Sequence, residues 1–178
     1  MDIILQTSRL LLRRFTDSEA DATLIYELNK DPHVLKYLQE PVLKNKTQAH
    51  DILQKIILPQ YKKDIGRWAI HLQENKEFIG WCGLKYRPEK KETDLGYRLK
   101  KTAWGHGYAT EAATASVLYG FTKLHLKTVV ARAHVDNHAS IAILQKIGMT
   151  YVEESIVDDC LVKTFLARLK NWKPPTNC

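Results

Sequence analysis

Cysteine is scarce in this chain, and the cysteines present form no motif. The 178 residues include three, Cys82, Cys160 and Cys178, which are odd in number and widely spaced, with no Cys-x-x-Cys pair among them. This pattern indicates neither a disulfide framework nor a zinc site. We therefore expect no metal ion, and a reducing compartment such as the cytoplasm.

Long hydrophobic runs are also missing. No segment approaches the roughly 20 apolar residues of a membrane-spanning helix. The first residues, Met1-Asp2-Ile3, carry an acid and no basic segment, so we expect no signal peptide and no membrane partner. Hydrophobic residues still make up 44% of the chain, enough for a buried core. We predict a single domain over residues 1–172 and a frayed tail over residues 173–178.

Acidic residues are outnumbered by basic ones. Lys and Arg total 27 against 20 Asp and Glu, giving a net charge of +7. A basic balance attracts polyanions in general, and we expect no specific nucleic-acid partner from it. The pairs Lys62-Lys63 and Lys90-Lys91 are typical of solvated loops. Lys100-Lys101 differs because it directly precedes the most informative segment of the chain.

That segment runs from Leu95-Gly96-Tyr97-Arg98-Leu99 into Trp104-Gly105-His106-Gly107-Tyr108-Ala109-Thr110-Glu111. It predicts a strand, a basic loop, a glycine-spaced turn and a helix. The first amides of a helix lack internal partners and lie at the positive end of the helix dipole. Small residues let an anion approach them closely, which favours a phosphate-binding turn. The alternative is an ordinary strand-to-helix turn.

Two well-known phosphate motifs are absent from this turn. No Gly-Lys-Ser/Thr follows, so it is not a P-loop. Thr110 stands where the dinucleotide fingerprint needs a third glycine or alanine.

Hydrophobic periodicity predicts a mixture of strands and helices. We expect helices from a capping box at Thr16-Asp-Ser-Glu19, which would turn Ala20 inward, and from Thr47 until Pro59. A short helical turn would lie at residues 33–38, and further helices at 109–122 and 138–147. Gly80 and Gly83 indicate a bulge or a close backbone approach. Strands are predicted at residues 3–13, 67–72, 77–86, 93–99, 127–134, 150–157 and 161–169.

A later block, Asn137-His138-Ala139-Ser140-Ile141 through Gly148-Met149, completes a resemblance. Together with Thr7-Ser-Arg9-Leu10 and the segment from Leu95 to Ala112, it resembles the GNAT superfamily of acyl-CoA-dependent N-acetyltransferases. The similarity is greatest to the branch that acetylates N-termini of ribosomal proteins. It covers residues 7–172 and implies an α/β (α+β) fold, with a mixed, largely antiparallel twisted sheet of about six to seven strands. Trp104 departs from the superfamily's usual Arg or Gln.

The resemblance also implies roles for individual residues, with acetyl-CoA as the co-substrate. The Leu99 amide would donate to the thioester oxygen, and Ser140 would protonate the leaving thiolate, with Asn137 on the pantetheine arm. Tyr151 is a competing proton donor. The alternative roles are a ladder bond for Leu99 and helix capping for Asn137 and Ser140. The cofactor-binding set is Tyr97, Arg98, Leu99, Trp104, Gly105, His106, Gly107, Tyr108, Ala109, Thr110, Asn137 and Ser140.

No general base stands out. We interpret His71, His106 and His134 as structural or surface residues, and Glu111 as an acid that offsets a helix dipole. Trp68 and Trp81 are candidates to line the acceptor site, with core packing as the alternative.

The acceptor itself is a primary amine of undetermined kind. A protein or peptide N-terminal α-amine is the leading interpretation, because its pKa of about 8 leaves more neutral amine than the value of about 10.4 for lysine. The alternatives are a small-molecule amine, such as a polyamine or an antibiotic, and a non-catalytic acyl-CoA-binding or ribosome-associated protein. The oligomeric state, monomer or homodimer, is left open.

Overall fold

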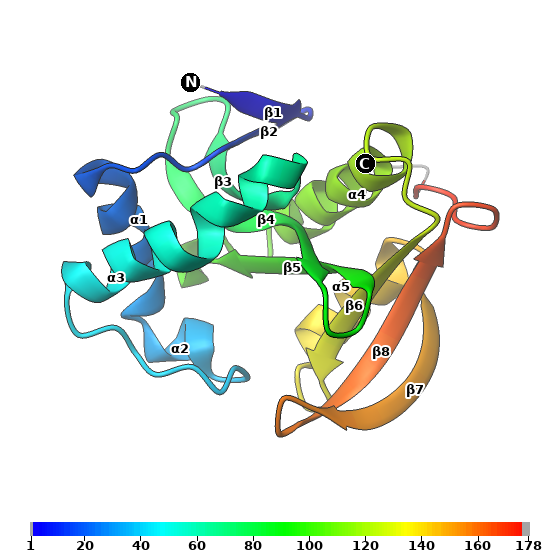
Figure 1. Ribbon diagram of the computed structural model, residues 1–178. Coiled ribbons are helices and arrows are strands. Elements are labelled where there is room, and N and C mark those ends of the chain that lie inside the picture. The colour runs from blue at the N-terminus through cyan, green and yellow to red at the C-terminus, as the bar shows by residue number, and fades with distance from the viewer. Residues whose placement is uncertain (1, 176–178) are drawn as a thin grey trace.

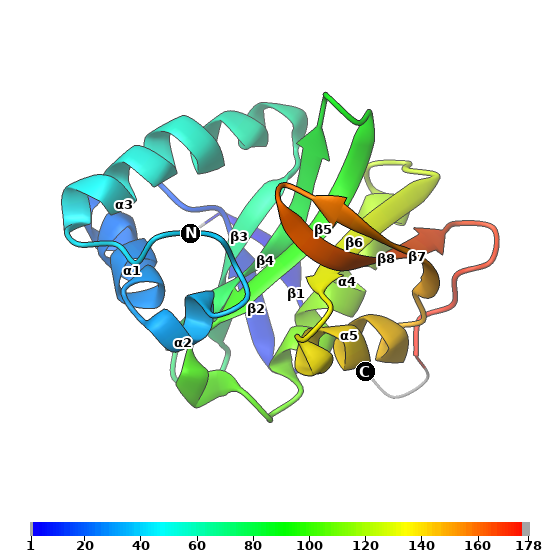
Figure 2. The same cartoon turned by 90° about the horizontal axis from the view of Figure 1, so that it is seen from below.

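The computed structural model describes residues 2–175 and contains one eight-stranded sheet between two groups of helices (Figures 1 and 2). The strand order is β1-β2-β3-β4-β5-β6-β8-β7, and β5–β6 is the one parallel pair among the described strands. The mixed, largely antiparallel fold is confirmed. The strands are β1 (Ile3–Gln6), β2 (Leu10–Arg13), β3 (Gly66–Leu72), β4 (Phe78–Arg87), β5 (Glu92–Leu99), β6 (Thr128–His134), β7 (Thr150–Val157) and β8 (Cys160–Arg168).

The strand predicted at residues 3–13 is wrong, and this accounts for the eighth strand. The chain reverses between β1 and β2, where the Thr7 N–H donates to the Leu10 carbonyl at 3.0 Å. The Thr7 hydroxyl also accepts from the Leu10 N–H at 3.1 Å. No glycine or proline marks this turn, so the sequence reads as one continuous strand.

The helices cover both faces of the sheet. On one face lie α1 (Glu19–Asn29), α2 (Pro32–Leu35) and α3 (Lys46–Ile52), with α3 continuing through a π turn and a 3₁₀ turn to Lys63. On the other face lie α4 (Tyr108–Thr122) and α5 (His138–Lys146). Small residues on α4, including Ala112 and Ala113, are fully buried, so this helix packs closely on β4 and β5.

Two helix starts differ from their prediction. The N-cap of α1 is Ser18, whose side chain accepts from the Asp21 N–H. Thr16 instead donates to the Asp21 carboxylate, which also binds Arg13. Asp21 is therefore buried and Ala20 exposed.

The N-cap of α3 is Asn45 rather than Thr47. Pro59 does not end this helical segment. It opens the 3₁₀ turn at a position where no backbone N–H is required.

The glycines of β4 behave as predicted. The β3–β4 register shifts between Ile70 and His71, which marks a bulge in β4. A Cβ on Gly80 would lie 2.1 Å from the Arg98 carbonyl oxygen, so only glycine allows β4 and β5 this close.

The remaining predicted elements are present with small shifts of their ends. Residues 176–178 of the predicted tail lie outside the described residues. No helix within residues 2–175 is long and apolar enough to cross a lipid bilayer.

Candidate active site

The sheet opens between β5 and β6. Within the described chain these strands pair only at Asp94–Val130 and Leu95–Ala131. Beyond Leu95, the edge of β5 from Gly96 to Leu99 has no strand beside it, while its other edge stays paired with β4. Its outward backbone groups, apart from the Leu99 carbonyl, are therefore available to an extended ligand.

The Leu99 amide points into this opening. The Lys100 N–H donates to the Ile79 carbonyl on β4 at 2.8 Å. Neighbouring strand residues direct their backbone groups to opposite edges, so the Leu99 N–H faces away from β4. The Leu99 carbonyl, on the same edge, accepts from the Trp104 indole at 3.0 Å. Trp104 thus anchors the loop that follows β5, and an ordinary ladder bond to β4 is excluded for the Leu99 amide.

The glycine-spaced turn forms an uncapped helix N-terminus. Gly105 and Gly107 have φ values of 78° and 79°, in the left-handed region that favours glycine. Gly107 is the N-cap of α4, and within residues 2–175 no side chain caps this helix. Helical bonding begins with the Glu111 N–H, which donates to the Gly107 carbonyl at 3.1 Å. The preceding amides of Tyr108, Ala109 and Thr110 are the natural partners of an anion.

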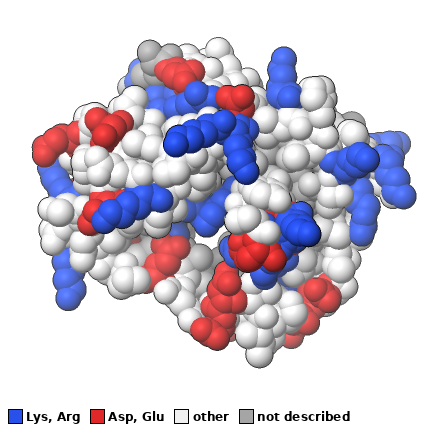
Figure 3. All heavy atoms as spheres, viewed as in Figure 1, with Lys and Arg blue, Asp and Glu red and all other residues white. Residues whose placement is uncertain are grey.

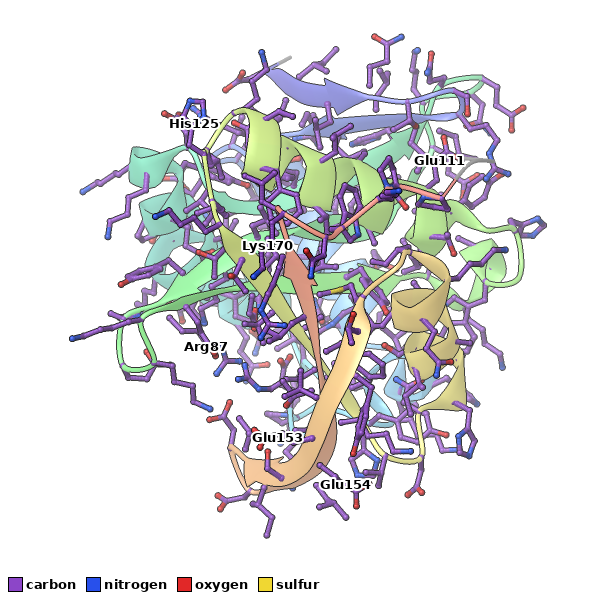
Figure 4. All side chains as sticks on the ribbon, turned by 90° about the vertical axis from the view of Figure 1, so that its right-hand side faces the viewer. Arg87, Glu111, His125, Glu153, Glu154 and Lys170 are labelled. Atoms are coloured by element: carbon purple, nitrogen blue, oxygen red, sulfur yellow. The ribbon has the colours of Figure 1, made fainter. Side chains whose placement is uncertain are left out.

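Glu111 fastens this turn to the β1–β2 hairpin. Its carboxylate accepts from the Thr7 hydroxyl at 2.6 Å, the Ser8 hydroxyl at 3.1 Å and the Arg9 guanidinium at 2.7 Å. Burial alone would raise the pKa of Glu111, but these hydrogen bonds outweigh it and hold the pKa below its ordinary value. Figure 4 shows Glu111 at the beginning of α4. Its role is structural.

Arg9 extends the brace to the turn itself. Its guanidinium donates to the His106 carbonyl at 2.9 Å and lies 4.7 Å from the centre of the Tyr108 ring. The sequence did not single out Arg9 for this contact, because its partners are about a hundred residues away.

Ser140 and Tyr97 meet on the α5 side of the opening. Their hydroxyl oxygens are 2.8 Å apart, and the Tyr97 hydroxyl also lies 3.1 Å from the Ser140 carbonyl oxygen. Burial raises the pKa of Tyr97, so this phenol keeps its proton at neutral pH. The Asn137 side chain accepts from the Ser140 backbone N–H at 3.1 Å and caps α5. The hydroxyls of Ser140 and Tyr97 are close enough to form a short proton relay.

Tyr151 lies elsewhere. It is on β7, the last strand of the sheet, with β6 and β8 between it and β5. Its side chain is 51% exposed and contacts Phe165 edge-to-face at 5.8 Å. Tyr97 therefore replaces it as the tyrosine beside Ser140. The signal was present in the alternation of β5, which puts Tyr97 on the same face as the buried Leu95 and Leu99.

The two tryptophans lie on opposite faces. Trp68 is completely buried and packs edge-to-face against Tyr119 of α4, at 5.2 Å. Trp81 faces α1 and α3, with the guanidinium carbons of Arg67 and Arg98 at 4.5 and 5.3 Å from its ring. Of the two, only Trp81 lies on the face opposite α4 and α5, which we call the acceptor face.

The histidines have structural partners. His71 accepts from the Arg13 Nε at 3.1 Å, and burial lowers its pKa, so it is neutral. The His134 ring packs 5.7 Å from Tyr37, and His106 stacks on Tyr108.

The acceptor face is bridged by loops from three parts of the chain. The Gln39 side chain donates to the Asp159 carbonyl at 2.9 Å, linking the segment after α2 to the β7–β8 turn. Arg87, from β4, binds Asp158 of the same turn at 2.9 Å. In Figure 3 the surface is indented between the α1–α3 side and the β7–β8 side, with lysines and arginines around the centre. Figure 4 shows Arg87 on this hairpin side of the molecule.

A family comparison agrees with this architecture. The family described as "Acetyltransferase (GNAT) domain" has a model that matches residues 9–150. The chain belongs to the GNAT acetyltransferases. Among curated proteins, the "Uncharacterized N-acetyltransferase p20" of Bacillus licheniformis is 32% identical over 156 residues, covering 87% of this chain and 85% of that protein. This acetyltransferase is accordingly an N-acetyltransferase, as the resemblance predicted, and the non-catalytic alternative is set aside.

Solved structures share the fold at lower identity. RimL, titled a ribosomal L7/L12 alpha-N-protein acetyltransferase in complex with coenzyme A, is 20% identical with a TM-score of 0.80, covering 94% of this chain and 98% of that one. A spermidine N-acetyltransferase from Vibrio cholerae, in complex with CoA and spermine, is 17% identical with a TM-score of 0.75, covering 92% and 98%. Because both kinds of acceptor occur on this fold, the fold alone does not select the amine.

Proposed function

We propose that this acetyltransferase transfers an acetyl group from acetyl-CoA to the α-amine of a peptide or protein N-terminus. The observation that carries the choice of acceptor is the charge of the acceptor face. Arg67, Lys85, Arg87, Arg98 and Arg132 point to it, against the three strand and loop carboxylates Asp94, Glu92 and Glu40. A polyamine with several positive charges would be repelled there, whereas a peptide brings a single reacting amine.

The carboxylates on this face support the same choice. Asp94 accepts from Arg87 at 3.1 Å, and Glu40 binds Arg98 at 2.9 Å. Each is hydrogen-bonded to a guanidinium, although burial raises the pKa of Asp94, so neither stands on this face as an unpaired carboxylate. An α-amine, with a pKa of about 8, provides a usable neutral fraction without a strong base, and lysine at about 10.4 does not.

The residues fit acetyl-CoA, which supplies the acetyl thioester when bound. The amides of Tyr108, Ala109 and Thr110 would hold the pyrophosphate, and the open edge of β5 would pair with the pantetheine arm. The Leu99 N–H donates to the thioester oxygen, where negative charge develops as the amine attacks the carbonyl carbon. Ser140 gives its proton to the leaving sulfur and regains one from Tyr97 or solvent. The amine's proton leaves to water. The resemblance to the family branch suggests ribosomal proteins as the acceptors. The reaction would then take place in the cytoplasm.

A product analysis tests this proposal. A short peptide with a free N-terminus and one internal lysine is incubated with acetyl-CoA, in parallel with spermine. We expect mass spectrometry to place the acetyl group on the α-amine, with little turnover of spermine. Acetylation confined to lysine, or preferred turnover of spermine, would reject the N-terminal assignment.

A further inference from the structure

A guanidinium on the acceptor face has no counter-ion. Within residues 2–175 no carboxylate lies within 4.0 Å of the Arg67 guanidinium, and no side chain there accepts a hydrogen bond from it. Three other arginines of this face near the opening are paired: Arg87 with Asp94, Arg98 with Glu40 and Arg132 with Glu92. Arg67 is thus a partly buried cation whose five N–H donors face no protein acceptor.

The sheet holds this cation in place. The guanidinium carbon of Arg67 lies 4.5 Å from the centre of the Trp81 ring, so the side chain is stacked on the indole while it stays partly exposed. Trp81 in turn lies over β5, where a Cβ added to Gly96 would be 3.3 Å from the indole. A stacked, partly buried guanidinium with its donors unoccupied is a prepared site for a planar anion.

The row of residues across the sheet leads from Arg67 to the opening. Arg67 is the cross-strand partner of Gly83, and Gly83 is the partner of Gly96. Gly96 is the first residue of β5 beyond the last pair with β6. Neither Gly83 nor Gly96 carries a side chain, and the Trp81 indole that stacks on Arg67 covers Gly96 at the place where the strands separate.

A second unpaired cation, Lys85, adds to the positive charge around Arg67. Lys85 pairs across the strands with Asp94, but that carboxylate is bound by Arg87, and no described carboxylate lies within 4.0 Å of the Lys85 ammonium. Burial and the nearby Arg67 both lower the pKa of Lys85. Burial and the neighbouring Arg98 likewise lower the pKa of Arg67. Burial is the larger cause of both shifts, and the more distant carboxylates, Asp94 for both groups and Glu40 for Arg67, offset it only in part.

We infer that the acceptor carries a carboxylate near its reacting amine, and that Arg67 binds this carboxylate and thereby selects the acceptor. A bidentate pair between the guanidinium and a carboxylate would satisfy donors that the protein leaves open. In a peptide, the carboxylate is an Asp or Glu side chain among the first residues. In a free amino acid, it is the carboxylate of the molecule itself. The inference rests on the proposed function for the peptide form.

Paired peptides test the selection. Peptides with Asp or Glu at the first three positions are compared with peptides that carry Asn or Gln there, and free aspartate and glutamate are assayed alongside. We expect kcat/KM for the wild type to favour acidic peptides by at least about tenfold, the effect of one well-placed ionic contact. In Arg67→Gln this preference should disappear. The matched control is Arg132→Gln, which removes an arginine of the same face that already has a partner and should keep the preference.

Two further measurements test the role of Arg67 even if Arg67→Gln does not fold. Arg67→Lys keeps the charge but loses the fork, and is expected to retain only part of the preference. Calorimetry with N-acetylated acidic and amide peptides, the reaction products, should show the same difference in wild-type affinity without turnover.

The outcomes separate the two claims. Equal use and equal binding of acidic and amide peptides by the wild type would overturn the role of Arg67 while leaving N-terminal acetylation intact. The inference would also fail if Arg67→Gln kept the wild-type preference. Turnover of free acidic amino acids alone, dependent on Arg67, would reject the N-terminal acceptor and retain the carboxylate site.

Discussion

At the scale of single residues, Ser140 has two separable parts. Its backbone N–H completes the Asn137 cap of α5, and its hydroxyl faces Tyr97. Helix capping and proton donation, the two interpretations of this segment, therefore both have a structural basis. They depend on different atoms of Ser140. A substitution that removes the hydroxyl leaves the cap in place.

Ser140→Ala is expected to lower turnover by about a hundredfold, the usual contribution of a positioned proton donor. Affinity for acetyl-CoA and the melting temperature should change little, because the capped backbone amide remains. Steady-state kinetics, calorimetry and thermal unfolding check the three quantities. Asn137→Ala is the matched variant, since it removes the cap and should cost about 1 kcal/mol of stability. An unchanged turnover in Ser140→Ala would assign the proton to Tyr97 or water.

At the scale of elements, the turn before α4 owes its shape to two positive-φ glycines. Gly107→Ala should reduce coenzyme A affinity at least about tenfold, or about 1.4 kcal/mol. The added Cβ strains the left-handed backbone at the helix start and lies 3.5 Å from the Arg9 guanidinium that braces the turn. Calorimetry measures the affinity. Gly148→Ala is the control, because Gly148 has a φ of 80° but lies after α5; it should lose stability and keep its affinity. Equal affinity in a folded Gly107→Ala would contradict the phosphate assignment.

The hairpin that braces α4 predicts a pH dependence. The pKa of Glu111 in the folded protein is lowered from its ordinary value of 4.5, so its contribution to stability is present above that value and is lost as the pH falls. Glu111→Gln should cost about 1–3 kcal/mol in denaturant unfolding at pH 7, and less than that near pH 3. Glu154→Gln, on the exposed strand β7, is the control and should be neutral. A cost that does not change with pH would mean that the charge is not responsible.

Most strands, the glycine turn before α4 and the later helices follow from local patterns, and the sequence predicts them well. The exceptions depend on distant contacts. Ser18 rather than Thr16 caps α1 because Thr16 is engaged by Asp21, which is itself drawn to Arg13. The β1–β2 turn is held by Glu111, far away in the chain. The position of Arg67 depends on the strand register, and the contact of Tyr97 depends on the packing of α5. Hydrophobic periodicity specifies neither.

At the scale of the whole molecule, the loops over the acceptor face are joined by exposed contacts. Asp158 is 67% exposed, so its ion pair with Arg87 should contribute under about 1 kcal/mol to stability. Asp158→Ala is nevertheless expected to raise the KM for a peptide acceptor several-fold, because the hairpin loses its tie to β4, while kcat and coenzyme A affinity stay unchanged. Asp51→Ala, which removes an exposed pair on α3, is the control. An unaltered KM would show that this tie does not shape acceptor binding.

The opening between β5 and β6 has a mechanical consequence. Two register pairs are the only strand pairing, in the part of the chain that the structure describes, between a half-sheet of β1–β5 and a half-sheet of β6, β8 and β7. A pantetheine arm lying along the free edges of β5 and β6 would take the place of a strand between them and connect the two half-sheets. Binding should then slow amide hydrogen exchange on both sides of the opening, in β5 and in β6.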